Sequence, residues 1–159
     1  MYKIYCDLDG VLSDFDTQFL KKSGASPDKF SSNYTNAEFW KFIEKYGESF
    51  WSDMPWMKNG KKLWLYIKDF NVAILSAPSR DYLSRTGKIK WVKNNLGDDV
   101  KLILINANEK YKYANDKSIL IDDREKNIES WRSAGGIGYL YTDSNINDII
   151  EKIDNLINK

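Results

Sequence analysis

Two carboxylates follow directly after the first apolar run of the chain. The stretch "KIYCDLDG" at 3–10 contains Asp7 and Asp9, with Gly10 after them. Residues i and i+2 of a strand point to the same face, so both carboxylates are expected to face one crevice. Such close carboxylates repel unless a cation, a shared proton or water offsets their charge, and oxygen ligands favour a hard cation such as Mg²⁺. A solvated turn is the alternative interpretation.

A second pair of acids occurs near the other end of the chain. The stretch "ILIDDREKN" at 119–127 again places two acids, Asp122 and Asp123, after an apolar run. The carboxyl ends of parallel strands meet at one edge of a sheet, so this pair is expected beside Asp7 and Asp9 in a metal site. Neighbouring residues of a strand face opposite sides, so one acid would ligate the ion and the other would support it. The alternative is an acidic helix N-terminus, where negative charge is favourable without a metal.

Two further segments predict phosphate binding at the same edge. Ser76 ends the apolar run "VAILS", and backbone N–H groups from Ala77 onward would be free to bind an anion. The alternative for Ser76 is a helix-capping serine before Pro78. Lys110 and Lys112 precede the second acidic pair, and either could reach a phosphate, although a solvated surface lysine is the alternative for each.

The elements that must position these residues follow from the apolar pattern. Short runs rich in β-branched residues predict strands, and most lack the polar alternation of a half-exposed strand, which indicates a parallel sheet buried on both faces. Periodic segments between them predict helices, so the chain is expected to form an α/β fold with right-handed crossovers. The predicted strands are 2–6, 72–76, 100–105, 118–121 and 136–141, and the predicted helices are 59–69, 81–97, 124–136 and 145–159.

The region 14–58 interrupts this alternation. It has no clear strand and is rich in large aromatic residues. We therefore predict an α/β core formed by 1–13 and 59–159, and a small α-helical cap formed by 14–58.

The composition excludes several kinds of function. Lys and Arg total 24 and Asp and Glu total 23, a net charge of +1, which gives no reason to expect a surface for long nucleic acid or for a membrane. Histidine is absent, which excludes imidazole catalysis and His-ligated zinc. The single cysteine, Cys6, cannot form an internal disulfide, and neither a signal peptide nor a membrane-spanning run is visible, so we expect a cytoplasmic protein.

Together these motifs resemble the haloacid dehalogenase superfamily of phosphotransferases. "DLDGV" matches its first motif, Ser76 looks like its second, Lys110 is preferred over Lys112 for its third, and "LIDD" resembles its fourth. The match is closest to the 5′(3′)-deoxyribonucleotidase-like branch, on "DLDGVLSDF", the "FW" pairs, "KIKWVKNNLG" and "LIDDREKNIESWRSAGG". "SAPS" departs from the threonine–serine–proline that these nucleotidases often carry. The resemblance implies a three-layer, Rossmann-like core with a small helical cap after the first strand.

The resemblance also implies a mechanism. Asp7 would attack phosphorus to form an aspartyl-phosphate, and Asp9 would protonate the leaving alkoxide and then deprotonate water. Mg²⁺ would lie between Asp7, the backbone carbonyl of Asp9 and one of Asp122 and Asp123. The implied phosphate-binding residues are Ser76, Ala77 and Lys110.

The predicted function is a Mg²⁺-dependent phosphomonoesterase that acts on nucleoside 5′- or 3′-monophosphates. Phe15, Phe39 and Trp40 are candidates for a pocket that stacks on the base, and the alternative is that they only pack the core of the cap. Another small phosphate or the phosphorylated end of a polynucleotide is an alternative substrate. A non-catalytic binding module on the same fold is the alternative from a different class.

Overall fold

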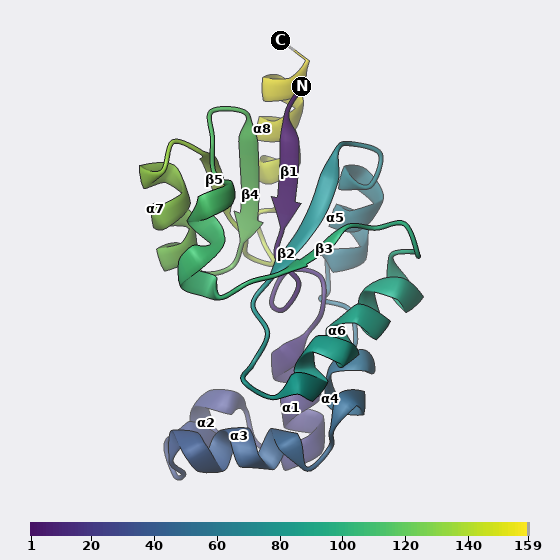
Figure 1. Cartoon of the computed structure of the whole chain (residues 1–159), viewed down its shortest axis with the longest axis vertical. Coiled ribbons are helices and arrows are strands. Elements are labelled where there is room, and N and C mark those ends of the chain that lie inside the picture. Colours follow the sequence, from purple (N-terminus) through teal and green to yellow (C-terminus); the bar gives the residue numbers. More distant parts are fainter. Residues whose placement is uncertain (159) are drawn as a thin grey trace.

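The computed structural model describes residues 1–158 and contains one sheet of five parallel strands (Figure 1). The strands are β1 (Lys3–Cys6), β2 (Val72–Ser76), β3 (Leu102–Leu104), β4 (Ser118–Asp122) and β5 (Ile137–Leu140). Their order across the sheet is β3-β2-β1-β4-β5. The central strand β1 therefore pairs with both β2 and β4, and these are the strands that carry the predicted site residues at their carboxyl ends.

Helices cover both faces of the sheet. Ile4 and Cys6 pack in one hydrophobic cluster with α5 and α8, whereas Tyr5 points to the other face and packs with α7. This alternation confirms the predicted three-layer α/β fold with a parallel sheet. The helices are α1 (Phe15–Ser23), α2 (Pro27–Ser31), α3 (Asn36–Glu44), α4 (Glu48–Ser52), α5 (Gly60–Ile67), α6 (Tyr82–Asn95), the 3₁₀ helix η1 (Ala107–Tyr113), α7 (Glu125–Ser133) and α8 (Ile146–Ile157).

The helix boundaries differ from the predicted ones by a few residues, and residues at the helix ends set where each helix starts or stops. The carboxylate of Asp81 accepts a hydrogen bond from the backbone N–H of Leu83 at 3.0 Å and so starts α6. Gly135 takes a positive φ of 91° shortly after α7 ends, a conformation that glycine adopts at little cost. β3 is an edge strand that pairs with β2 alone, and it is shorter than predicted. The apolar pattern does not predict η1.

Four short helices, α1 to α4, occupy the region 14–58 (Figure 1). Helices α1, α2 and α3 lie at the end of the molecule toward which the strands point. Their aromatic side chains pack together, as shown by the stacked rings of Phe19 and Phe39, whose centroids are 4.7 Å apart. Buried residues of these helices and of the sheet form one continuous cluster. The division into core and cap therefore stays a prediction, since packing shows no break between the two.

Among residues 1–158, no helix combines the length and the apolar character needed to cross a membrane.

Candidate active site

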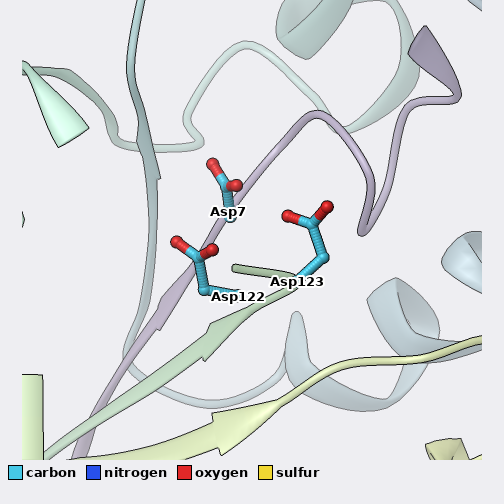
Figure 2. Close-up of side chains that lie close together, drawn as sticks. All are labelled: Asp7, Asp122 and Asp123. Atoms are coloured by element: carbon cyan, nitrogen blue, oxygen red, sulfur yellow. The ribbon is translucent and has the colours of Figure 1, made fainter. Parts of the chain in front are cut away.

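The pairing of β1 with β4 brings the two acidic motifs together. The ladder places Cys6 opposite Ile121, and the backbone N–H of Asp7 continues it by donating to the Ile121 carbonyl at 2.9 Å. Asp7, Asp122 and Asp123 consequently face one another, and each offers a carboxylate oxygen within 4.8 Å of the others (Figure 2). Acids from opposite ends of the sequence thus form one cluster.

Gly10 lets the chain turn directly over this cluster. Its φ of 84° lies in the left-handed region, and a Cβ atom at this position would collide with the carboxylate of Asp123. The turn is closed by the backbone N–H of Gly10, which donates to the Ser13 carbonyl at 2.8 Å. A residue with a side chain at position 10 would therefore displace Asp123 from the cluster.

The cluster carries more negative charge than its surroundings neutralise. Asp7 and Asp122 are buried and Asp123 is more exposed. Burial raises the pKa of Asp7 to about 7, with the attraction of Lys110 opposing the shift and the repulsion of Asp122 and Asp123 adding to it. The carboxylate of Asp123 is partly desolvated by its neighbours although the residue reaches the surface, and this desolvation and the charge of Asp122 raise its pKa to about 6. Closely placed carboxylates with raised pKa values have the charge surplus that a cation would relieve.

Lys110 is the cation that the structure places in the cluster. Its Nζ lies 2.9 Å from Oδ1 of Asp7 and 2.7 Å from Oδ2 of Asp122, and the side chain is buried. Burial alone would lower the pKa of Lys110, but the two carboxylates outweigh this and raise it. Lys112, the second candidate, is exposed and pairs with Glu109.

Asp122 is held more firmly than the other two acids. Its Oδ1 accepts from the backbone N–H of Arg124 at 2.9 Å, and its Oδ2 accepts from Lys110 and from the side-chain amide of Asn127 at 3.0 Å. Asn127 was not predicted as a site residue. Its place in the first turn of α7, directly after the acidic pair, was the available signal.

Ser76 and Ala77 lie beside the acids. Together with Asp7, Asp9 and Lys110 they line a small cavity of about 60 Å³. Ser76 is buried at the end of β2, which neighbours β1 in the sheet. The sequence-predicted phosphate-binding residues therefore meet the acids in one hollow.

Asp9 lies apart from the three-carboxylate cluster. Its Oδ1 accepts from the hydroxyl of Ser13 at 2.8 Å, and its Oδ2 pairs with Nζ of Lys88. Lys88, on α6, is buried and was missed by the sequence analysis. The available signal was a lysine that shares its helix face with Ser84 and Trp91, both buried.

A larger pocket opens next to the cavity. It has a volume of about 710 Å³ and is lined by Asp9, Ala77 and Asp123 from the site and by Phe15, Phe39, Trp40 and Trp51 from the helices of 14–58. Phe15 also packs edge-on against Phe50, with ring centroids 5.5 Å apart. The predicted pocket residues thus line a pocket and pack the helical region at the same time.

Comparison with solved structures identifies the fold, although no protein-family model and no curated protein matches the sequence. A Had-superfamily hydrolase from Ehrlichia chaffeensis superposes with a TM-score of 0.57 at 15% identity, covering 98% of this chain and 97% of that one. A hydrolase from Streptococcus pneumoniae TIGR4 gives 0.57 at 14% identity, covering 94% and 98%. The chain has the haloacid dehalogenase fold.

A predicted phosphatase from Clostridium acetobutylicum shares this haloacid dehalogenase fold, with a TM-score of 0.54, 16% identity and coverage of 95% and 99%. These matches confirm the predicted fold. At sequence identities this low, they do not indicate the substrate. The resemblance to the nucleotidase-like branch stays a prediction.

Proposed function

We propose that the protein is a Mg²⁺-dependent phosphomonoesterase with Asp7 as its nucleophile. The observation that carries this proposal is the buried arrangement of Asp7 between Lys110 and two further acids, beside a cavity lined by Ser76. Buried carboxylates are costly unless a proton, a paired cation or a ligand offsets their charge. A phosphate ester together with a divalent cation supplies the matching charges.

The residues of the chain divide the chemistry between them. Oδ2 of Asp7 attacks phosphorus while its Oδ1 stays paired with Lys110, and the bond to the leaving oxygen breaks. Asp9 lines both hollows; in its protonated form it donates a proton to the leaving oxygen, and the carboxylate that results accepts a proton from the water that hydrolyses the aspartyl-phosphate, which restores the acid. Ser76, the backbone of Ala77 and Lys110 hold the transferred phosphoryl oxygens in place.

The donor set fits Mg²⁺. Carboxylate and carbonyl oxygens are the ligands that this ion takes, and the raised pKa values of Asp7 and Asp123 reflect a charge that an ion would offset. We propose Asp7, Asp123 and the backbone carbonyl of Asp9 as ligands, with Asp122 supporting them, because the Asp122 oxygens already accept from three donors. When bound, the ion would screen the repulsion between the nucleophile and the phosphate.

A nucleoside monophosphate is the substrate that the pocket favours. Its aromatic walls suit a base, and stacking contributes about 1–3 kcal/mol per base. Asp14, Asp16 and Asp143 line the pocket together with Arg124. Because the acids outnumber the arginine, the pocket disfavours substrates that carry a second phosphate or a polynucleotide backbone. The partner that we propose is therefore a small phosphorylated molecule. We also propose a cytoplasmic location, because the single cysteine suits a reducing compartment.

Hydrolysis assays test this function. Phosphate release is measured with MgCl₂ and with EDTA from nucleoside 5′- and 3′-monophosphates, nucleoside bisphosphates, sugar phosphates, end-phosphorylated oligonucleotides and p-nitrophenyl phosphate. We expect Mg²⁺-dependent release that is fastest from a nucleoside monophosphate. An equal rate across all esters would remove the substrate assignment, and no release from any of them would favour the non-catalytic binding module.

A further inference from the structure

Lys88 is a buried lysine that has no role in the chemistry proposed above. It projects from α6 with 1% of its surface exposed, pairs with the Asp9 carboxylate, and donates from Nζ to the Ser76 hydroxyl at 3.1 Å. The same Nζ lies 5.1 Å from the centroid of the Trp51 ring. An ammonium group is expensive to bury unless paired, so the structure gains from Lys88 only through these contacts.

The Asp9 carboxylate is fixed at both oxygens. Ser13 donates to Oδ1 at 2.8 Å and Lys88 reaches Oδ2, while Ser13 is itself buried. The Asp9 side chain nevertheless keeps 24% of its surface exposed, and it borders both the small cavity and the larger pocket. Asp9 is therefore held in one orientation at the point where the two hollows meet, which is where a leaving oxygen would lie.

The close packing of α6 on α4 places Lys88 beside Asp9. A Cβ atom at Gly87 would collide with the side chain of Trp51 and would approach the Glu48 carbonyl to 2.7 Å, so only glycine lets α6 and α4 lie so close. The indole N–H of Trp91 donates to the Met54 carbonyl at 2.8 Å and fixes the same helix further along. Two helices thus meet so that a lysine between them points at Asp9.

We propose that Lys88 is a positioning residue that, together with Ser13, orients Asp9 toward the leaving group. This inference rests on the proposed function, in which Asp9 transfers the proton. Lys88 does not itself touch the reacting atoms. It holds the Asp9 carboxyl group so that its proton can reach the departing oxygen, and it pairs with the carboxylate that this transfer leaves behind. Such a proton transfer contributes about 10²–10⁴-fold to a rate.

Two esters with different leaving groups distinguish this positioning role from phosphate binding alone and from stabilisation of the fold alone. Phenyl phosphate and p-nitrophenyl phosphate differ by one nitro group, but phenolate is much the more basic leaving group and depends more on protonation. If Lys88 orients Asp9, its loss slows phenyl phosphate more than p-nitrophenyl phosphate. A lysine that only binds phosphate, or only stabilises the fold, would slow both esters by the same factor.

The test compares kcat/KM for both esters with saturating Mg²⁺ in wild type, Lys88→Met, Lys88→Arg and Ser13→Ala. This ratio reports the step in which the leaving group departs. We expect Lys88→Met to lower kcat/KM about tenfold more for phenyl phosphate than for p-nitrophenyl phosphate, a part of the full contribution of proton transfer. Ser13→Ala should show the same bias at a smaller size, and Lys88→Arg should restore part of the loss.

Lys90→Met is the matched control. Lys90 also lies on α6 and pairs with Glu48 of α4, but it is exposed and does not reach Asp9. It should leave the ratio between the two esters unchanged. Ser13→Ala removes only a hydroxyl and keeps the inference testable if Lys88→Met does not fold.

The results can overturn the role of Lys88 and the proposed phosphatase activity separately. Equal losses on both esters in Lys88→Met and Ser13→Ala, with an active wild type, would overturn the positioning role and leave the phosphatase assignment standing. A wild type that is inert toward both esters in the presence of Mg²⁺ would overturn the proposed function, and the role of Lys88 with it.

Discussion

The sheet edge and the helical region 14–58 build their parts of the pocket in different ways. At the edge, the backbone ladder between β1 and β4 fixes Asp7 beside Asp122, so position along a strand determines position in the site. In the helical region, side chains such as Phe15 and Phe39 reach the pocket by packing on one another, with ring centroids 6.3 Å apart. Changes at the edge should therefore affect chemistry first, and changes in the helical region should affect substrate preference first.

Removing the nucleophile should have the largest effect. Asp7→Asn keeps the shape of the side chain but loses the attacking carboxylate, and we expect kcat for p-nitrophenyl phosphate to fall at least about 10⁴-fold. Asp116→Asn, an exposed acid in the turn before β4, should leave kcat unchanged. Comparable activity in wild type and Asp7→Asn would remove Asp7 from its role.

The two lysines of η1 also test the sheet edge. Lys110→Met leaves Asp7 and Asp122 buried without their shared cation, and breaking a buried pair costs about 3–5 kcal/mol of unfolding free energy. Lys112→Met removes only an exposed pair with Glu109, and exposed ion pairs contribute little to stability, so the free energy of unfolding should stay close to that of wild type. Urea unfolding of the two variants measures the difference, and similar stabilities would contradict the placement of Lys110.

Trp40 tests the helical side. We expect Trp40→Leu to lower kcat/KM for a nucleoside monophosphate by about 5- to 150-fold, the equivalent of about 1–3 kcal/mol of stacking. For glycerol phosphate, which has no ring to stack, kcat/KM should stay near that of wild type. Tyr34→Leu is the control, because Tyr34 stacks on Phe30 and does not line the pocket. Equal losses on both substrates in Trp40→Leu would show that the aromatic wall serves packing alone.

A smaller effect is expected from pH and metal together. In the metal-free protein, folding raises the pKa of Asp7 from 3.8 to about 7, so the folded state binds more protons than the unfolded state between these values. The free energy of unfolding contributed by this group therefore falls as pH rises through that window. Mg²⁺ takes the place of the proton, so the rise in Tm on replacing EDTA by MgCl₂ should be larger at about pH 8 than at about pH 5. Equal rises at both pH values would argue against Asp7 as a ligand.

The sequence predicted the sheet edge well because strand ends are easy to locate. Asp7, Asp122 and Ser76 each close an apolar run, and parallel strands bring their carboxyl ends to one edge. The choice between Lys110 and Lys112 depended on which way η1 turns, and the apolar pattern says nothing about a 3₁₀ helix of this kind.

The helical region and Lys88 were harder to predict for physical reasons. Helices as short as α2 and α4 are set by end groups and by aromatic packing, since five residues make too few turns for a periodic pattern. Lys88 lies on the buried face of α6 with Ser84 and Trp91, whereas a lysine in a helix is ordinarily expected to be solvent-exposed. Its partner Asp9 lies 79 positions away in the chain. Only the three-dimensional contact shows that the two belong together.

The central claim is that acids from β1 and β4 share one divalent ion while Asp7 carries the phosphoryl group. A crystal structure grown with MgCl₂ and trifluoroberyllate, a mimic of the phosphorylated carboxylate, tests it directly. We expect beryllium bonded to an oxygen of Asp7, Mg²⁺ bound by Asp7, Asp123 and the backbone carbonyl of Asp9, and fluorines contacting Ser76 and Lys110. Both groups missing from this edge at saturating concentrations, or beryllium on a different side chain, would contradict it.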